Sequence, residues 1–274
     1  MCELFALSAQ TPAEVTFSLG VLARRGGLTG PHKDGWGAAY YEGRDIRLIK
    51  EAHSAADSDW VRFIENHPLR STIVLSHIRQ ASVGRRILSN THPFARELGA
   101  RMHVLAHNGT LRDIETAAPF AGRRYRPVGD TDSETAFCAL MERMVPVWGD
   151  GTAMPPVNRR LEIFAAFAAD ARRLGSANFI YADGDALFIH AHRRIPAGGG
   201  PARPPGLHIL SRACALSGPT VEGAAISAGK PGQKVTLVAS VPLTDEPWEA
   251  LAEGTCLALK NGRLVARAAS GEGL

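Results

Sequence analysis

The chain has 274 residues, of which 45% are hydrophobic and 21% are charged, ordinary values for a globular protein with a substantial core. Its net charge of +4 comes from arginine pairs scattered along the sequence, so we expect no nucleic-acid partner. The four cysteines have no CxxC spacing, which argues against a disulfide framework or a zinc site, and we predict neither a metal nor another cofactor.

The N-terminus predicts neither export nor membrane insertion. Its short apolar stretch lacks the basic lead-in of a signal peptide. No apolar run in the chain approaches the roughly 18–20 residues that cross a bilayer. We therefore expect a cytoplasmic protein with no membrane association. Because the sequence shows no repeat and no convincing linker, we predict one domain over residues 1–274, after removal of Met1.

The first predicted elements are a strand and a helix. Residues 3–8 have the apolar character of a short buried strand. The segment Thr11-Pro12-Ala13-Glu14 carries three signals of a helix start: a Thr N-cap, a Pro in the first turn and a Glu placed for a capping box. The apolar spacing that follows predicts a helix to residue 25, ended by Gly26-Gly27.

Strands dominate the next hundred residues. We predict a hairpin from the strands 36–41 and 46–50, followed by a helix over 57–67. The apolar runs 72–78 and 102–107 are predicted to be buried strands. Both runs end at clusters of polar residues, where a sheet commonly places its functional loops.

The second half of the chain begins with helices and then changes to strands. Helices are predicted over 132–145 and 161–174. Two hairpins follow from the D-G turn within 179–192 and the N-G turn within 256–267. Further strands are predicted at 207–211 and 234–241, and the Pro/Gly-rich stretch 196–206 is interpreted as a surface loop without an assigned function. These elements predict an α+β fold with mostly antiparallel strands.

Cys2 is the first candidate catalytic residue, because only Met1 precedes it. Removal of Met1, which a small second residue favours, would leave Cys2 with both a thiol and a free α-amine. The thiolate is the reactive form of cysteine, and an α-amine titrates at about 7.7–8.0. One residue could therefore supply both the nucleophile and the base. The alternative is that Cys2 only opens a buried strand.

Three polar segments could form the rest of a site. Arg79, after the first apolar run, could bind a carboxylate through two hydrogen bonds. The side-chain amide of Asn108 and the backbone N–H of Gly109 could form an oxyanion hole. Asp132 could bind an ammonium group. Each also has an ordinary structural interpretation: a solvated arginine, an N-G turn and a helix cap.

Together these residues resemble a known pattern. The class II (N-terminal-nucleophile) glutamine amidotransferases, and in particular their short stand-alone YafJ-like bacterial members, carry similar motifs in the same order. The resemblance covers about the first half of the chain and implies a four-layer α/β/β/α sandwich with mostly antiparallel sheets. The motifs that carry it are MCELFALSA, RGGLTGPHKDGWG, SHIRQAS, NTHPF, AHNG and GDTDSE.

The resemblance implies catalytic roles for three residues. Cys2 would attack the side-chain amide of glutamine, with its own α-amine as the general base. Asn108 and the N–H of Gly109 would stabilise the oxyanion of the tetrahedral intermediate, and Gly109 would also contact the substrate. The product on the enzyme would be a γ-glutamyl thioester.

The resemblance also implies a binding site for the amino-acid end of glutamine. Arg79, assisted by Ser82, would bind the α-carboxylate, and Asp132 would bind the α-ammonium. The chain departs from synthase-linked members at two positions. Where those members often have an aromatic residue after the arginine and a histidine after the hydroxyl residue, this chain has Gln80 and Val83. The loop that closes over the substrate, and the substrate itself, can therefore differ from those of the synthase-linked members.

The expected reaction is hydrolysis of glutamine to glutamate and ammonia, with the ammonia passed to an unidentified acceptor such as a synthase subunit. One alternative is hydrolysis of a γ-glutamyl peptide or amide, as in ergothioneine-pathway relatives. An alternative of another class is an inactive subunit that senses glutamine. The joint presence of Cys2, Asn108, Gly109 and Asp132 argues against an inactive protein.

Three histidines and one aspartate are interpreted structurally. The segment that contains Asp34 is expected to support the nucleophile, and Thr91-His92-Pro93 is expected to shape the wall of the pocket. His190 and His192 alternate along a predicted strand and are interpreted as surface residues, because no third metal ligand lies nearby in the sequence.

Overall fold

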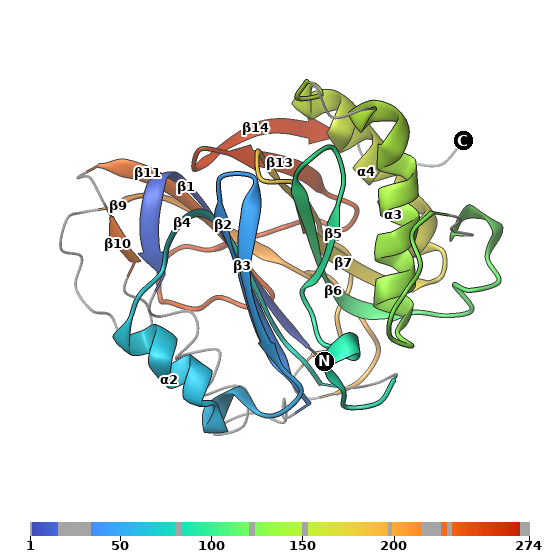
Figure 1. The fold of residues 1–274 in the computed structure, drawn as a ribbon, viewed down its shortest axis with the longest axis horizontal. Coiled ribbons are helices and arrows are strands. Elements are labelled where there is room, and N and C mark those ends of the chain that lie inside the picture. The colour runs from blue at the N-terminus through green and yellow to red at the C-terminus, as the bar shows by residue number, and fades with distance from the viewer. Residues whose placement is uncertain are drawn as a thin grey trace.

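Two antiparallel sheets lie face to face, with helices on their outer faces (Figure 1). The computed structural model describes residues 2–15, 34–80, 84–120, 124–149, 153–196, 199–214, 226–228 and 232–268. Two sheets between two helical layers form a four-layer sandwich, which confirms the predicted α/β/β/α fold with mostly antiparallel sheets.

The first sheet has the strand order β12-β9-β11-β1-β4-β2-β3, and β10 pairs with the far end of β1. The central strand β1 lies between β4 and β11, which are distant from each other in sequence. The strands are β1 (Glu3–Val15), β2 (Trp36–Glu42), β3 (Asp45–Glu51), β4 (Arg70–Ile78), β9 (His208–Cys214), β10 (Ile226–Ala228), β11 (Gln233–Ala239) and β12 (Glu249–Ala250).

The second sheet has the order β14-β13-β8-β7-β6-β5. Two of its hairpins are the predicted D-G and N-G hairpins, which form β7–β8 at the centre and β13–β14 at one edge. The strands are β5 (Phe94–Glu97), β6 (Met102–Leu111), β7 (Gly175–Ala182), β8 (Leu187–His190), β13 (Cys256–Lys260) and β14 (Arg263–Ala268).

Helix α2 packs on the first sheet, and helices α3 and α4 pack on the second (Figure 1). Each predicted helix of this group is confirmed within a few residues. Ser58 caps α2 by accepting a hydrogen bond from the N–H of Val61, and Thr131 caps α3 in the same way. The helices are α2 (Asp59–Asn66), α3 (Asp132–Trp148) and α4 (Val157–Arg172), with 3₁₀ turns at Ala55–Asp57, Leu88–Asn90 and Ala118–Phe120.

Side-chain alternation along the strands divides the core into three layers. In β1, Leu4 and Ala6 face the second sheet, whereas Phe5 and Leu7 face α2. In β6, Val104 and Ala106 face the first sheet, whereas Leu105 between them faces α3. This alternation places the even-numbered residues of β1 and β6 in the space between the sheets.

The predicted helix start at Thr11 is wrong, because residues 11–15 belong to β1. The backbone N–H and the hydroxyl of Thr11 both donate to Oε1 of Gln233, next to β1 in the sheet. Ala13 pairs with Ser71 of β4 and with Ala228 of β10. Long-range strand pairing overrides the local capping signals here. The remainder of the predicted helix, residues 16–25, lies outside the described residues.

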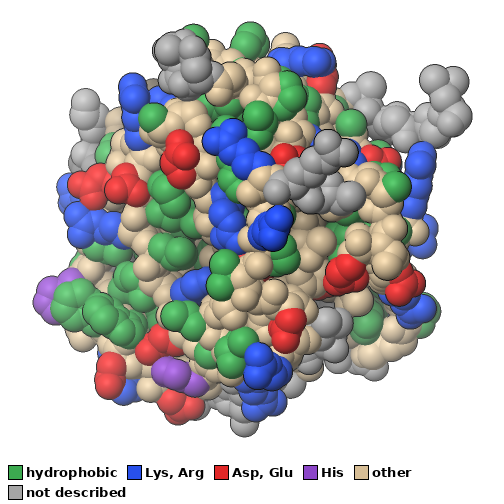
Figure 2. Space-filling view, turned by 45° about the vertical axis from the view of Figure 1, so that its right-hand side comes forward, with side chains coloured by type: hydrophobic (Ala, Val, Ile, Leu, Met, Phe, Trp, Pro, Cys, Tyr) green, Lys and Arg blue, Asp and Glu red, His purple; other side chains and the backbone are tan. Residues whose placement is uncertain are grey.

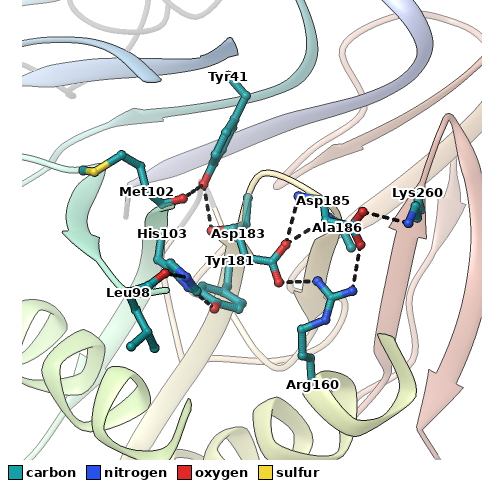
Figure 3. Close-up of polar contacts among 11 residues, drawn as sticks. Tyr41, Leu98, Met102, His103, Arg160, Tyr181, Asp183, Asp185, Ala186 and Lys260 are labelled. Carbon is teal, nitrogen blue, oxygen red and sulfur yellow. Dashed lines mark hydrogen bonds and ion pairs between the residues drawn. The ribbon is translucent and has the colours of Figure 1, made fainter. Parts of the chain in front are cut away.

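A buried polar network lies at the end of β7 where the chain turns into β8 (Figure 3). Arg160 of α4 is 1% exposed and donates to the carboxylates of Asp183 and Asp185. Lys260 of β13 donates to Asp185 at 2.7 Å. On the other side of the turn, the hydroxyl of Tyr41 donates to the carbonyl of Ala182 at 2.8 Å. The network therefore connects α4 and both sheets.

Candidate active site

Cys2 lies directly before the central strand β1, at the end that faces β6 of the other sheet. Its Sγ accepts a hydrogen bond from the backbone N–H of Gln80 at 3.3 Å. Burial raises the pKa of the Cys2 thiol, and the Gln80 N–H and the Arg79 charge only partly oppose this effect. The neutral thiol is therefore favoured at rest, so a base must accept its proton before Cys2 can act as a nucleophile.

Asn108 faces Cys2 from β6 of the second sheet. Its Nδ2 donates to the backbone carbonyl of Cys2 at 2.5 Å and lies 3.4 Å from Oγ of Ser240. The side chain is 1% exposed, and its Oδ1 has no hydrogen-bond partner among the described residues. A buried acceptor without a partner is costly, so a ligand N–H at this position would be stabilising.

The prediction that Asn108 and Gly109 form a loop after a strand is wrong. Both residues lie inside β6, where they pair with Asn178 and Ala177 of β7. The strand continues because β7 extends the ladder to Leu111. The predicted strand ended at His107, where the polar cluster begins, although polar side chains can occupy strand positions that face a cavity.

The backbone N–H of Gly109 points away from β7. The N–H of Leu111, two residues further, donates to Oδ2 of Asp132 at 2.7 Å, and N–H groups two apart in a strand point to the same side. The neighbouring strand β5 pairs with β6 only as far as Leu105. A Cβ at position 109 would collide with the carbonyl oxygen of Ser176. Only glycine fits here, and its N–H faces an edge that β5 does not cover.

Ser240 and Asn178 support Asn108 and were not identified from the sequence. Oγ of Ser240 accepts a hydrogen bond from the N–H of Leu4 at 3.0 Å and contacts the Asn108 amide. Nδ2 of Asn178 donates to the carbonyl of Asn108 at 3.0 Å and to that of Arg193 at 2.7 Å. Nothing in their local sequence marks them, because each acts on a segment far away in the chain.

Arg79 is buried directly after β4 and is surrounded by backbone carbonyls. Its guanidinium donates to the carbonyl oxygens of Asp34 at 3.3 Å, Gly84 at 3.2 Å and Arg85 at 3.2 Å. Burial lowers the pKa of Arg79, while the nearby Cys2 and Asp34 raise it. Arginine nonetheless remains cationic in proteins. Arg79 therefore supplies a positive charge beside Cys2.

Asp132 begins α3 and ties this helix to β6. Its Oδ2 accepts from Leu111, and its Oδ1 accepts from the backbone N–H of Ser133 at 2.8 Å. An ionised carboxylate has further lone pairs, so these bonds leave capacity for a ligand. The predicted roles of Arg79 and Asp132 remain predictions. Ser82 and Val83 lie outside the described residues.

The cavity at Cys2 has a volume of about 660 Å³. Cys2, Gln80, Asn108 and Gly109 all line it, so the structure brings the predicted nucleophile and oxyanion-hole residues to one place. Arg79 and Asp132 do not line it. The other lining residues are Thr110, Arg112, Gly175 and Ser176 beside β6 and β7, and Ile195, Gly200, Pro201 and Ala202 from the following loop.

His190 and His192 are buried, so their interpretation as surface residues is wrong. Nδ1 of His190 lies 2.6 Å from the carbonyl of Ala177, and Nδ1 of His192 accepts from the Ala177 N–H. The ring of His190 lies 6.2 Å from that of Phe179, and Nε2 of His192 lies 3.1 Å from a carboxylate oxygen of Glu253. Within the described residues, no group of three potential ligands could bind a metal ion.

The described helices include none long and apolar enough to cross a membrane. On the face drawn in Figure 2, basic and acidic side chains are interspersed among hydrophobic ones.

His92, expected to shape the pocket wall, is buried but does not line the cavity at Cys2. Its ring lies tilted against that of His77, with a centroid distance of 4.2 Å. Asp34 is also buried and forms an ion pair with Arg86.

Residues 1–272 match the family model of the class-II glutamine amidotransferases. The chain belongs to this family. It is 34% identical over 267 residues to the putative glutamine amidotransferase YafJ of Escherichia coli K12, covering 93% of this chain and 95% of the relative. It is 31% identical to a putative glutamine amidotransferase of Haemophilus influenzae, covering 97% and 86%.

Solved structures agree with this assignment. A predicted glutamine amidotransferase from Pseudomonas aeruginosa is 36% identical, with a TM-score of 0.71 and coverage of 97% of this chain and all of that chain. The glutamine phosphoribosylpyrophosphate amidotransferase of B. subtilis has a TM-score of 0.59 at 15% identity, and this chain matches 50% of its length. That likeness shows a shared fold. The family and these neighbours support an enzyme.

Proposed function

We propose that this protein hydrolyses the side-chain amide of glutamine through a γ-glutamyl thioester on Cys2. The observation that carries the proposal is the position of Cys2 and Asn108, which face each other from two sheets at one cavity. Glutamate and ammonia would be the products. An unidentified acceptor, such as a synthase subunit, would use the ammonia.

The raised pKa of the Cys2 thiol requires a base, and the α-amine of Cys2 would serve after removal of Met1. As Sγ bonds to the amide carbon, negative charge develops on the carbonyl oxygen. The N–H of Gly109 would donate to this oxygen, and the side-chain NH2 of Asn108, which donates to the Cys2 carbonyl in the resting structure, would turn to donate to it as well. The C–N bond then breaks, ammonia leaves with the transferred proton, and water hydrolyses the thioester.

Arg79 and Asp132, with Ser82, would bind the α-carboxylate and α-ammonium of the substrate. Both charged side chains lie next to lining residues of the cavity: Arg79 precedes Gln80, and Asp132 contacts the strand that carries Gly109. A site with both charges would reject analogues that lack either α-group, because a buried charge would be left without its partner.

Two measurements test this proposal. Active protein should lack Met1 by intact-mass analysis, since a blocked α-amine could not act as the base. A glutamine analogue with a diazoketone in place of the amide should label Cys2 alone. Burial raises the pKa of Cys256 to about 12 and also raises that of Cys138, so both should be unreactive. Labelling at Cys138, Cys214 or Cys256 with Cys2 unmodified would overturn the assignment.

Catalytic activity also separates an enzyme from the inactive glutamine-sensing subunit. Cys2→Ala should abolish glutamine hydrolysis, and its folding can be checked by thermal unfolding. A sensor would bind glutamine equally well with and without the Cys2 thiol and would release no glutamate. Wild-type protein that binds glutamine but produces no glutamate would contradict the proposed hydrolysis.

A further inference from the structure

The Cys2 cavity extends beyond the reacting groups to Arg112, and we propose that this far side binds an anionic group on the leaving amine of a γ-glutamyl substrate. The inference rests on the proposed function, because it assigns a substrate class to the same Cys2 site. It concerns substrates in which the γ-amide nitrogen carries a carboxylate-bearing group, such as γ-glutamyl amino acids.

The size of the cavity is the first observation. Free glutamine loses only ammonia, which needs no binding surface of its own. The volume of about 660 Å³ lies in the range of sites for drug-sized ligands and exceeds what one amino acid fills. The wall beyond Gly109 consists of Thr110, Arg112 and Ser176, whose side chains offer hydroxyl groups and one positive charge. This wall is suited to a polar, anionic group.

The position of Arg112 is the second observation. Side chains alternate along β6, so Asn108 and Thr110 belong to its inner face together with Val104 and Ala106. Arg112 follows the end of the strand at the next position of this alternation. The N–H of Arg112 donates to the carbonyl of Leu174 at 3.0 Å, which fixes the backbone. At about 3.3 Å per strand residue, its Cα lies about 13 Å from that of Asn108. Arg112 is thus too far to contact the scissile amide but can meet a group several bonds beyond it.

The charge of Arg112 is the third observation. Among the described residues that line the cavity, Arg112 is the one with a charged side chain. No hydrogen bond or ion pair of its guanidinium is present within the described part of the chain, so its donors are not committed to a carboxylate of the protein. A guanidinium can bind a ligand carboxylate through two parallel hydrogen bonds.

The loop across the cavity leaves this side open. Gly200, Pro201 and Ala202 have small side chains where they line the cavity. The loop ends are fixed, since Arg194 and Arg203 exchange two backbone hydrogen bonds of 3.1 and 3.0 Å. Arg194 also donates to the carbonyl of Ser240 at 2.8 Å. Beyond Ile195, the small residues Gly200, Pro201 and Ala202 preserve space for a leaving group larger than ammonia.

The chemistry is the same as for glutamine. Sγ of Cys2 bonds to the γ-carbonyl carbon, and the bond from that carbon to the amine nitrogen breaks. The amine takes up the proton that came from the thiol and leaves. Water then hydrolyses the thioester to glutamate and regenerates the thiol. No electrons are transferred to or from another reactant.

The test compares γ-glutamylglycine with its neutral amide, γ-glutamylglycinamide, and with glutamine. We expect wild-type kcat/KM to be about tenfold higher for γ-glutamylglycine than for the neutral amide, the effect of one charge-assisted pair. Arg112→Gln should bring this ratio close to one, and Arg112→Lys should restore part of it. Arg263→Gln, which removes an exposed charge from β14 at the other edge of the sheet, should keep the wild-type ratio.

Two kinetic results would overturn the inference: equal kcat/KM for the two peptides in wild-type protein, or an equal loss for all three substrates in Arg112→Gln. The second result would mean that Arg112 binds the shared γ-glutamyl half. Titration calorimetry on Cys2→Ala separates this inference from the proposed function. A tenfold binding preference for γ-glutamylglycine without wild-type turnover would contradict only the hydrolysis. Equal affinities would contradict the role of Arg112.

Discussion

Asn108 of the second sheet donates a hydrogen bond to the backbone carbonyl of Cys2 at 2.5 Å, across the interface between the sheets. The two residues are 106 positions apart in the sequence. Their alignment depends on how the sheets pack, because side chains from the inner faces of β1 and β6 meet in one core layer. The active site therefore depends on the stability of this interface as well as on its own residues.

Asn108→Ala should lower kcat for glutamine by roughly 10²–10³, the effect of removing one oxyanion-hole donor. Substrate binding should change less, because the developing negative charge exists only after the thiol attacks. Steady-state kinetics give both values. A change in KM alone, with kcat unaltered, would show that Asn108 binds the ground state and does not stabilise the oxyanion.

Ser240→Ala should lower kcat by a smaller factor than Asn108→Ala, because Ser240 positions the Asn108 amide without contacting the substrate. KM for glutamine should stay within about twofold, and Ser240→Thr, which keeps the hydroxyl, should recover most of the activity. Ser211→Ala is the control, because its hydroxyl pairs with Thr236 on another part of the first sheet. Equal loss in the alanine and threonine variants would indicate a packing role instead.

Arg79→Ala should weaken substrate binding through loss of a charge-assisted pair with the α-carboxylate. The expected cost is about 2–3 kcal/mol in kcat/KM, appearing mainly as a higher KM. Arg85→Ala removes a neighbouring exposed arginine and should have little effect. Unchanged kcat/KM for every γ-glutamyl substrate in Arg79→Ala would show that another residue binds this carboxylate.

Arg160→Ala should destabilise the fold by about 3–5 kcal/mol, because Asp183 is 0% exposed and would become a buried charge without its partner. Urea unfolding measures this change. The adjacent Arg159→Ala breaks an exposed ion pair with Glu162 and should cost less than about 0.5 kcal/mol. Similar values for the two variants would mean that water or a rearranged Lys260 compensates the Asp183 charge.

The sequence by itself determined the candidate nucleophile, the motif order and most of the strands and helices. Cys2 is identifiable from its position, and the motifs around Asn108 and Asp132 have short, specific sequences. The hairpins β7–β8 and β13–β14 follow from local turn chemistry. These features depend on residues that are close together in the chain.

The tertiary structure decided which residues surround Cys2. Thr11 has every local signal of a helix start. Its hydrogen bond to Gln233 and the pairing of β1 with β4 nevertheless place it in the central strand. Ser240 and Asn178 reach the site because strands distant in sequence pair or pack across the sandwich. Strand pairing and sheet packing depend on contacts between distant segments, and local residue patterns contain no information about those contacts.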